Sequence, residues 1–203
     1  MLLHVPTGMV ELRTGRFAVD IQMKMRLERT LSILPPQHLH GLQYIEIRDR
    51  QNYEGGSTNV ASDTWPTTPA SRSNYWVMLD IDSFDPRFRP INNYPNGLHY
   101  TLLHEMGHVV DWFTDSFRWI RQHDRTGHRL LTRRHHTGRT SGQQEKFADT
   151  YADLFFYPQG IQERDACVRV ILNSPAFSSL PSYTRLPNGW RLPARRSALE
   201  SFP

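Results

Sequence analysis

The sequence has little cysteine: among its 203 residues, only Cys167 carries a thiol. One thiol cannot form a disulfide within the chain, and it cannot build a structural metal site that depends on several cysteines. Any metal site must therefore take its ligands from histidine, aspartate or glutamate. A chain without disulfides is typical of a reducing compartment.

Long hydrophobic runs are also absent. No apolar stretch approaches the roughly 20 residues that a membrane-spanning helix needs. The first residues lack the charged-then-apolar layout of a secretory signal peptide. We therefore expect no membrane partner, and either a cytoplasmic location or export without a signal peptide, as for a toxin or effector. Hydrophobic residues make up 38% of the chain, which suits one modest core in one domain.

Lysine is scarce, because Lys24 and Lys146 are the only lysines among 24 basic residues. The formal net charge is +4, and residues 116–140 contain seven arginines and four histidines with Asp124 as the only acid. Such a segment forms a solvated loop or surface helix by default, and it can attract an acidic peptide or a nucleic acid. It contains no recognisable nucleic-acid motif, so nucleic acid is not the partner that we expect.

An H-E-x-x-H motif occurs at residues 104–108, inside a segment whose apolar residues recur with helical spacing. Residues four apart share one helix face, so the imidazoles of His104 and His108 can bind one metal ion. Glu105, beside them, can take a proton from a metal-bound water. Gly107 destabilises a helix interior, so its presence indicates that another segment approaches closely there.

A catalytic zinc site generally has three protein ligands and an open position for water. We predict Glu145 as the third ligand, since residues 143–153 form an apolar helical pattern that Ser141 can cap. Asp149 follows Glu145 by four and shares its face, where it can accept the free N–H of a ligating histidine. The alternative is an amphipathic helix with solvated acids, in which Glu145 pairs with an arginine.

The two motifs together, H-E-x-x-H and a downstream helix that reads E-x-x-A-D, resemble the gluzincin branch of the zincin metallopeptidases. The arrangement looks most like small lethal-factor-like catalytic domains, and the resemblance covers mainly residues 75–157. It implies that His104, His108 and Glu145 hold one Zn²⁺ ion, that Glu105 is the catalytic glutamate, and that Asp149 supports a ligand. It also implies that the strand before the metal helix is a substrate-binding edge strand, although an interior strand is equally compatible with the sequence.

The metzincin branch of the same superfamily fits poorly. Its pattern needs a glycine three residues past the second histidine and a third ligand three beyond that, where this chain has Asp111 and Thr114. Asp111 falls on the ligand side of the helix, one turn past His108. There it can orient a ligand or cap a neighbouring arginine, while a metal bound to it would leave all ligands along one helix.

Lethal-factor-like enzymes place a tyrosine seven residues before the ligand glutamate, where this chain has Gly138. The oxyanion of the transition state then needs another hydrogen-bond donor. We predict His135 or His136 for this role; the alternative is that both are surface histidines of a basic loop. Tyr151 points away from the metal face of its helix, so we expect it in the core.

The remaining segments give weaker patterns. Residues 17–27 alternate between apolar and polar, which favours a strand in a hairpin that turns at residues 14–15. Helix propensity nevertheless rises from Met23 to Leu34. The two prolines that follow Leu34 end any regular element there. We predict strands over residues 42–48 and 75–81, a long loop over 49–74 and a helix over 161–173.

These patterns predict an α+β fold: one zincin-like metallopeptidase domain over residues 1–172, with a small mixed sheet, an HExxH helix and a downstream glutamate helix, followed by an irregular tail over 173–203. The predicted function is zinc-dependent endopeptidase action on a peptide or protein substrate. One alternative is a metal-binding regulatory or toxin domain that acts mainly by partner binding. A second is a basic nucleic-acid-binding protein.

Overall fold

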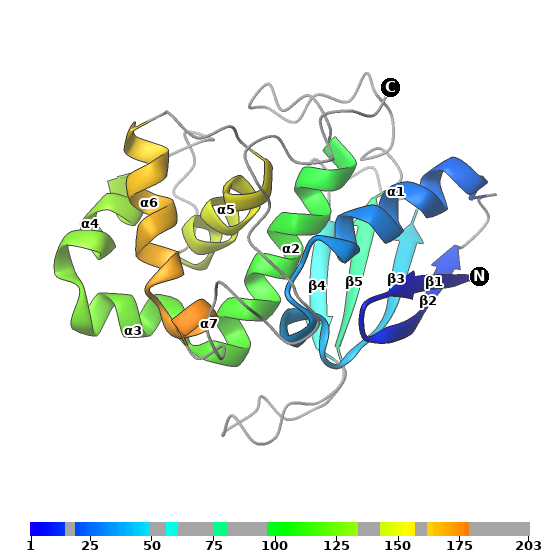
Figure 1. Cartoon of the computed structure of the whole chain (residues 1–203), viewed down its shortest axis with the longest axis horizontal. Helices are drawn as coiled ribbons and strands as arrows, with labels where there is room; N and C mark the ends of the chain where they lie inside the picture. Colours follow the sequence, from blue (N-terminus) through cyan, green and yellow to red (C-terminus); the bar gives the residue numbers. More distant parts are fainter. Residues whose placement is uncertain are drawn as a thin grey trace. The chain divides into compact units, whose positions relative to one another are not determined.

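The computed structural model describes residues 1–14, 19–48, 56–60, 75–80, 97–133, 143–156 and 162–178. The chain forms two compact units, Met1–Met106 and Gly107–Pro203, and the boundary falls inside a continuous helix, α2 (Gly97–Thr114). The first unit contains a sheet and the second is helical (Figure 1). The α+β class predicted from the sequence is confirmed.

Among the described residues, five strands build one mixed sheet in the order β1-β2-β3-β5-β4. β1 and β2 form an antiparallel hairpin, β2, β3 and β5 run parallel, and β4 pairs antiparallel with β5. The strands are β1 (Leu2–Val5), β2 (Gly8–Thr14), β3 (Leu42–Arg48), β4 (Gly56–Val60) and β5 (Tyr75–Asp80). The predicted strand over residues 42–48 matches β3, and the one over 75–81 matches β5 to within a residue.

The alternating segment 17–27 is helical from residue 21 onward, so its strand prediction is wrong. Helix α1 (Ile21–Ser32) begins at Asp20, whose carboxylate accepts the backbone N–H of Met23 at 2.7 Å. That bond satisfies one of the amide groups that a helix start leaves without a partner. The alternation misleads because Ile21 and Met25 are exposed, while Leu27 and Leu31, four apart, are buried.

The N-terminal hairpin turns at residues 6–7 rather than at residues 14–15, because Val5 pairs with Gly8. Gly8 has φ of +132°, a conformation that a side chain would disfavour. The hairpin partner of β2 is therefore β1, which precedes it in the chain, and not the segment 17–27 that the sequence predicted.

The long loop predicted over residues 49–74 contains β4 in its described part, residues 56–60. Since β4 pairs with β5 along its whole length, β5 has a neighbour on each side. Of the two alternatives that the sequence left open for residues 75–81, the interior strand is confirmed and the edge strand is wrong. Within the described residues, the sheet ends at β1 and β4.

One face of the sheet is covered by α1 (Figure 1). Aliphatic side chains fill this layer, and burying each one stabilises the fold by roughly 1.5–3 kcal/mol. They come from the strands and from α1: Leu3, Val10, Leu12, Leu27, Leu31, Ile45, Ile47, Val77 and Leu79.

A buried polar pair joins α1 to the start of α2. The Thr30 hydroxyl donates to the carbonyl of Arg26 at 2.8 Å, so it has no second proton for the Nδ1 of His99, which lies in contact with it. His99 therefore carries its proton on Nδ1 and donates to Thr30. Burial, and then the charge of Arg26, lower the pKa of His99 to about 4, so the ring is neutral near pH 7.

The second unit contains the last part of α2 and five more helices among the described residues: α3 (Ser116–His123), α4 (Arg125–Arg133), α5 (Gln143–Phe156), α6 (Gln162–Leu172) and α7 (Pro175–Ser178). Tyr151 lies in its core, fully buried between Phe155 and Phe177. The prediction that Tyr151 is a core residue is confirmed. The helix predicted over residues 161–173 matches α6.

The sequence predicts a mostly irregular tail from residue 173. Helix α7 lies within it, and its residues Ala176 and Phe177 are buried. The backbone N–H of Ala176 also donates to the Ser116 hydroxyl at 2.8 Å, which fixes α7 to the start of α3. Residues 179–203, the rest of the predicted tail, lie outside the described residues.

Candidate metal centre

Helix α2 places both histidines of the motif on one side. Its buried apolar residues, Leu102, Leu103, Met106, Val109 and Val110, recur with helical spacing, while His104 and His108 are only partly buried. The helix predicted around the H-E-x-x-H motif is therefore confirmed. One helical turn separates the two imidazoles.

Gly107 brings α2 against α5, as its place in a helix interior predicted. A Cβ atom at this position would lie 2.7 Å from the Cα of Ala148 and 3.0 Å from the Cβ of Tyr151. Real side chains do not tolerate such a distance to backbone, so only glycine fits. The two helices cross at this point with almost no side chain between them, which brings the first turn of α5 near His108.

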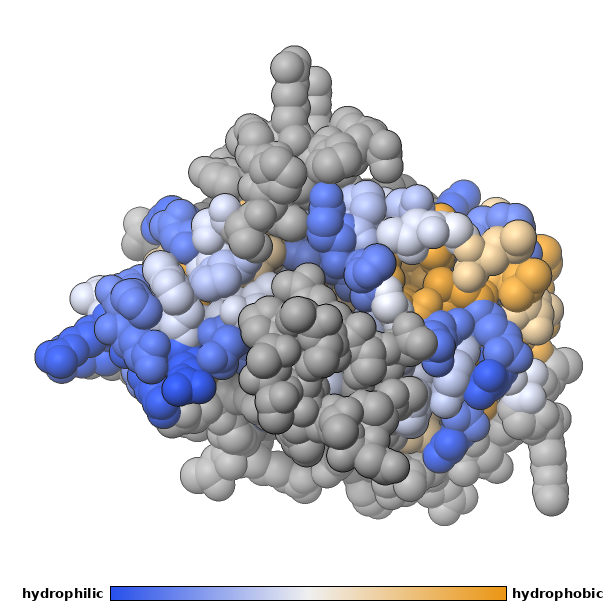
Figure 2. Space-filling view, turned by 90° about the horizontal axis from the view of Figure 1, so that it is seen from below, coloured by the Kyte–Doolittle hydropathy of each residue, from blue (hydrophilic) through white to orange (hydrophobic). Residues whose placement is uncertain are grey.

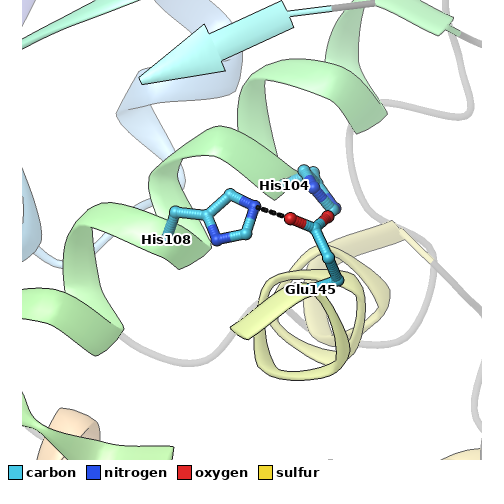
Figure 3. A group of neighbouring side chains, drawn as sticks. All are labelled: His104, His108 and Glu145. Carbon is cyan, nitrogen blue, oxygen red and sulfur yellow. Dashed lines mark ion pairs between the residues drawn. The ribbon is translucent and has the colours of Figure 1, made fainter. Parts of the chain in front are cut away.

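The crossing brings Glu145 to the two histidines (Figure 3). One ligand atom from each of His104, His108 and Glu145 lies within 4.8 Å of the others, so the three could hold a metal ion. The Nε2 of His108 is 3.4 Å from a carboxylate oxygen of Glu145. Two ligands about 2.0–2.1 Å from one tetrahedral ion stand roughly 3.4 Å apart, so the spacing suits a shared ion.

The same spacing is also that of an ion pair, which forms if His108 is protonated. The exposed fractions favour an accessible site, since the side chain of His108 is 21% exposed and that of Glu145 is 42% exposed. A closed structural metal site would bury all its ligands. Partial exposure leaves room for water or a substrate at the ion.

Glu105 follows His104 on α2 and is nearly buried, at 5% exposed. A step of one residue turns about 100° around a helix, so Glu105 lies beside the ligand face. This is the position that the sequence predicted for a proton-transfer group.

Asp111, one turn past His108, stabilises the corner between α2 and α3 with its side chain. Its carboxylate accepts the backbone N–H of Phe117 at 2.6 Å, and Asp115 turns the chain there with a left-handed φ of 52°. Burial raises the pKa of Asp111 to about 6, against the opposing effects of the Phe117 hydrogen bond and the charge of His108. Asp111 thus holds the helix corner, and its predicted contact with a metal ligand stays a prediction.

The other predicted site residues divide into two groups. Asp149 lies on α5, one turn after Glu145 and partly buried, and its bond to a ligating histidine stays a prediction. His135, His136, Gly138 and Ser141 lie outside the described residues.

Two residues near the ligands were missed in the sequence. The ring of Tyr100, which is 6% exposed, lies 6.3 Å from that of His104 between centroids. Lys146 donates from Nζ to the carbonyl of Thr132 at 2.7 Å, which fixes the end of α4 to the turn that carries Glu145. The spacing of Tyr100, four before His104, was a usable signal, whereas no pattern indicated the Lys146 contact.

No family model, no curated protein and no solved structure matches this chain. In the described part of the chain, no helix combines the length and the apolar character that crossing a bilayer requires. The site must therefore be interpreted from its own chemistry.

Proposed function

We propose that this protein is a zinc-dependent endopeptidase with a zincin-like catalytic domain. The observation that carries the proposal is the grouping of His104, His108 and Glu145 from two helices, with Glu105 next to the first ligand. Two imidazoles and one carboxylate suit zinc, although the same set also holds iron or manganese.

A zinc ion bound there would lower the pKa of a water molecule toward neutrality and polarise the carbonyl of a peptide bond. Glu105 would take the proton of the attacking water and pass it to the leaving amine. Its burial suits this task, because a carboxylate shielded from bulk water keeps the proton for the leaving group. His135 or His136 is the proposed donor to the oxyanion.

The sheet offers a place for the substrate backbone. An edge strand presents unpaired N–H and C=O groups, to which an extended peptide can add. Since β5 is interior, the proposed strand for this contact is β4, which pairs antiparallel with β5 and has no second neighbour in the described sheet.

Metal content tests the ligand set. We expect about one zinc per chain in the wild type by elemental analysis, and little zinc in Glu145→Ala purified in parallel. Gln122→Ala, at an exposed position of α3, is the control. Unchanged zinc in Glu145→Ala would place the third ligand elsewhere.

Hydrolysis of a peptide library tests the role of Glu105. Glu105→Gln keeps the size of the side chain but cannot accept the proton, so we expect retained zinc and a loss of activity of at least 10²-fold. Full activity in this variant would remove Glu105 as the base. A zinc-loaded wild type that cleaves no peptide would favour the alternative, a metal-binding domain that acts through partners.

A further inference from the structure

The helices that connect the metal ligands carry an exposed basic surface. Figure 2 shows hydrophilic residues gathered over α3 and α4, at the left of the view. Three arginines of these helices are exposed, and we call them together the arginine face: Arg121 on α3, and Arg125 and Arg129 on α4. The basic segment predicted as a loop or surface helix is helical as far as residue 133.

The arginine face is not neutralised by its neighbours. Asp115 lies 3.6 Å from Arg118 and pairs with it. Asp124 accepts the backbone N–H of Gly127 at 2.8 Å and keeps its negative charge, so it offsets one of the three positive charges. Among the residues that the structure describes, no carboxylate forms an ion pair with the three arginines. Since paired charges lose most of their attraction for a ligand, the absence of pairing leaves a net positive surface.

The positive charge extends to the helix that carries Glu145. The pKa of His128 on α4 is lowered, first by burial and then by the charges of Arg121 and Lys146. These two groups come from α3 and α5, so basic side chains of two helices act on one ring of α4. A neutral His128 adds no charge of its own near pH 7.

The end of α4 is fixed beside the candidate metal centre. Lys146 bonds to the carbonyl of Thr132 and directly follows Glu145. Arg125 and Arg129 are one turn apart on α4, about 6 Å along its axis, and Thr132 begins the next turn. The arginines therefore form a row that leads along α4 toward the first turn of α5.

We propose that the arginine face binds an acidic segment of the polypeptide substrate and delivers the chain to the metal centre. This inference rests on the proposed peptidase function. Alternate residues of an extended peptide are about 6.6–6.8 Å apart, close to the rise between Arg125 and Arg129. A segment with acids at alternate positions would therefore match the row, and the long-range attraction would raise the association rate.

Binding is measured with the Glu105→Gln variant, so that no cleavage occurs. The probe is a fluorescent peptide of alternating aspartate and serine, compared with an asparagine–serine peptide and a single-stranded DNA oligonucleotide. Fluorescence anisotropy is recorded at 50 and 200 mM salt. We expect the acidic peptide to bind at least 10-fold tighter than the neutral one, and to weaken as salt rises.

A triple variant, Arg121→Gln with Arg125→Gln and Arg129→Gln, should bind the acidic peptide at least 10-fold more weakly and keep its zinc. The matched control, Gln122→Ala with Thr126→Ala, changes exposed uncharged positions of the same helices and should bind as before. Equal binding by the triple variant would overturn the proposal. Tighter binding of the oligonucleotide than of the acidic peptide would also overturn it, in favour of a nucleic-acid surface.

Hydrolysis separates this inference from the proposed function. Acidic-peptide binding that needs the arginines, in a protein that cleaves no peptide, would support the surface and remove the peptidase. If the cleavage rate is the same for acidic and neutral peptides, and the same in the triple variant as in the wild type, the peptidase is supported and the arginine face is not its substrate-binding site.

Discussion

At the residue scale, the buried carboxylate of Asp111 has two opposing effects on the folded state. Its charge is destabilising because it is buried, while its hydrogen bond stabilises a helix corner. The carboxylate accepts the Phe117 amide and so holds the corner between α2 and α3. Its pKa is about 6 in the folded protein, above the ordinary value of 3.8, mainly because burial disfavours the charged form. A carboxyl with a raised pKa binds its proton more tightly when folded. The contribution of Asp111 to the free energy of unfolding therefore falls as pH rises from about 4 to about 6.

Asp111→Asn keeps an oxygen that accepts the Phe117 amide but removes the titration. In the metal-free protein, we expect the variant to gain stability relative to the wild type between pH 4 and pH 7. A shift of about two pKa units corresponds to roughly 3 kcal/mol at most. Urea unfolding at pH 4, 5.5 and 7 measures the difference, with Gln122→Ala at an exposed position as control. A difference that is constant over this range would contradict the prediction.

At the element scale, the crossing of α2 and α5 determines where Glu145 lies. Gly107, like Met106, is neither a proposed metal ligand nor the proposed proton-transfer group of the motif. Its missing side chain nevertheless lets the backbone of Ala148 approach to a distance that a Cβ could not accept. Packing of bare backbone thus holds the turn that carries Glu145 near His108.

Gly107→Ala tests this packing. Alanine favours an isolated helix by about 1 kcal/mol relative to glycine, so any loss must come from the contact with α5. We expect a net destabilisation of about 1–3 kcal/mol, as for other overpacked sites, together with weaker zinc binding because Glu145 is displaced. Urea unfolding and a zinc titration measure both effects. A variant as stable as wild type, with the same zinc affinity, would show that the helices adjust without cost.

The elements were predictable where the sequence pattern and the final environment agree. β3, α2 and α5 each bury the face that their periodicity marks, and Gly107 predicted the close approach. Residues 21–27 were not predictable from alternation, because Ile21 and Met25 are apolar yet exposed and the Asp20 cap determines the helix start. The sequence of β4 (GSTNV) has no apolar pattern. It was therefore not predictable as a strand, because it is defined by its backbone pairing with β5.

At the scale of the whole molecule, the proposed ligands come from helices separated in sequence by α3 and α4. A ligand that binds only the folded state raises stability by RT ln(1 + [L]/Kd), or about 2.7 kcal/mol at a hundred times Kd. We expect zinc to raise the Tm of the wild type and a chelator to lower it, with no such shift in Glu145→Ala. Differential scanning fluorimetry over a zinc series measures this. An identical Tm with and without zinc would contradict a metal site built by the fold.

The buried thiol of Cys167 gives this chain a reporter of its own. It is the only cysteine, it lies on α6 in the helical unit, and it is fully buried. A thiol-reactive dye can therefore modify the protein only when that unit opens, and the rate of modification measures how often it does so. Opening that becomes rarer when zinc is added would reveal coupling between the metal and the helical unit in a single unmodified protein, with no substitution and no substrate.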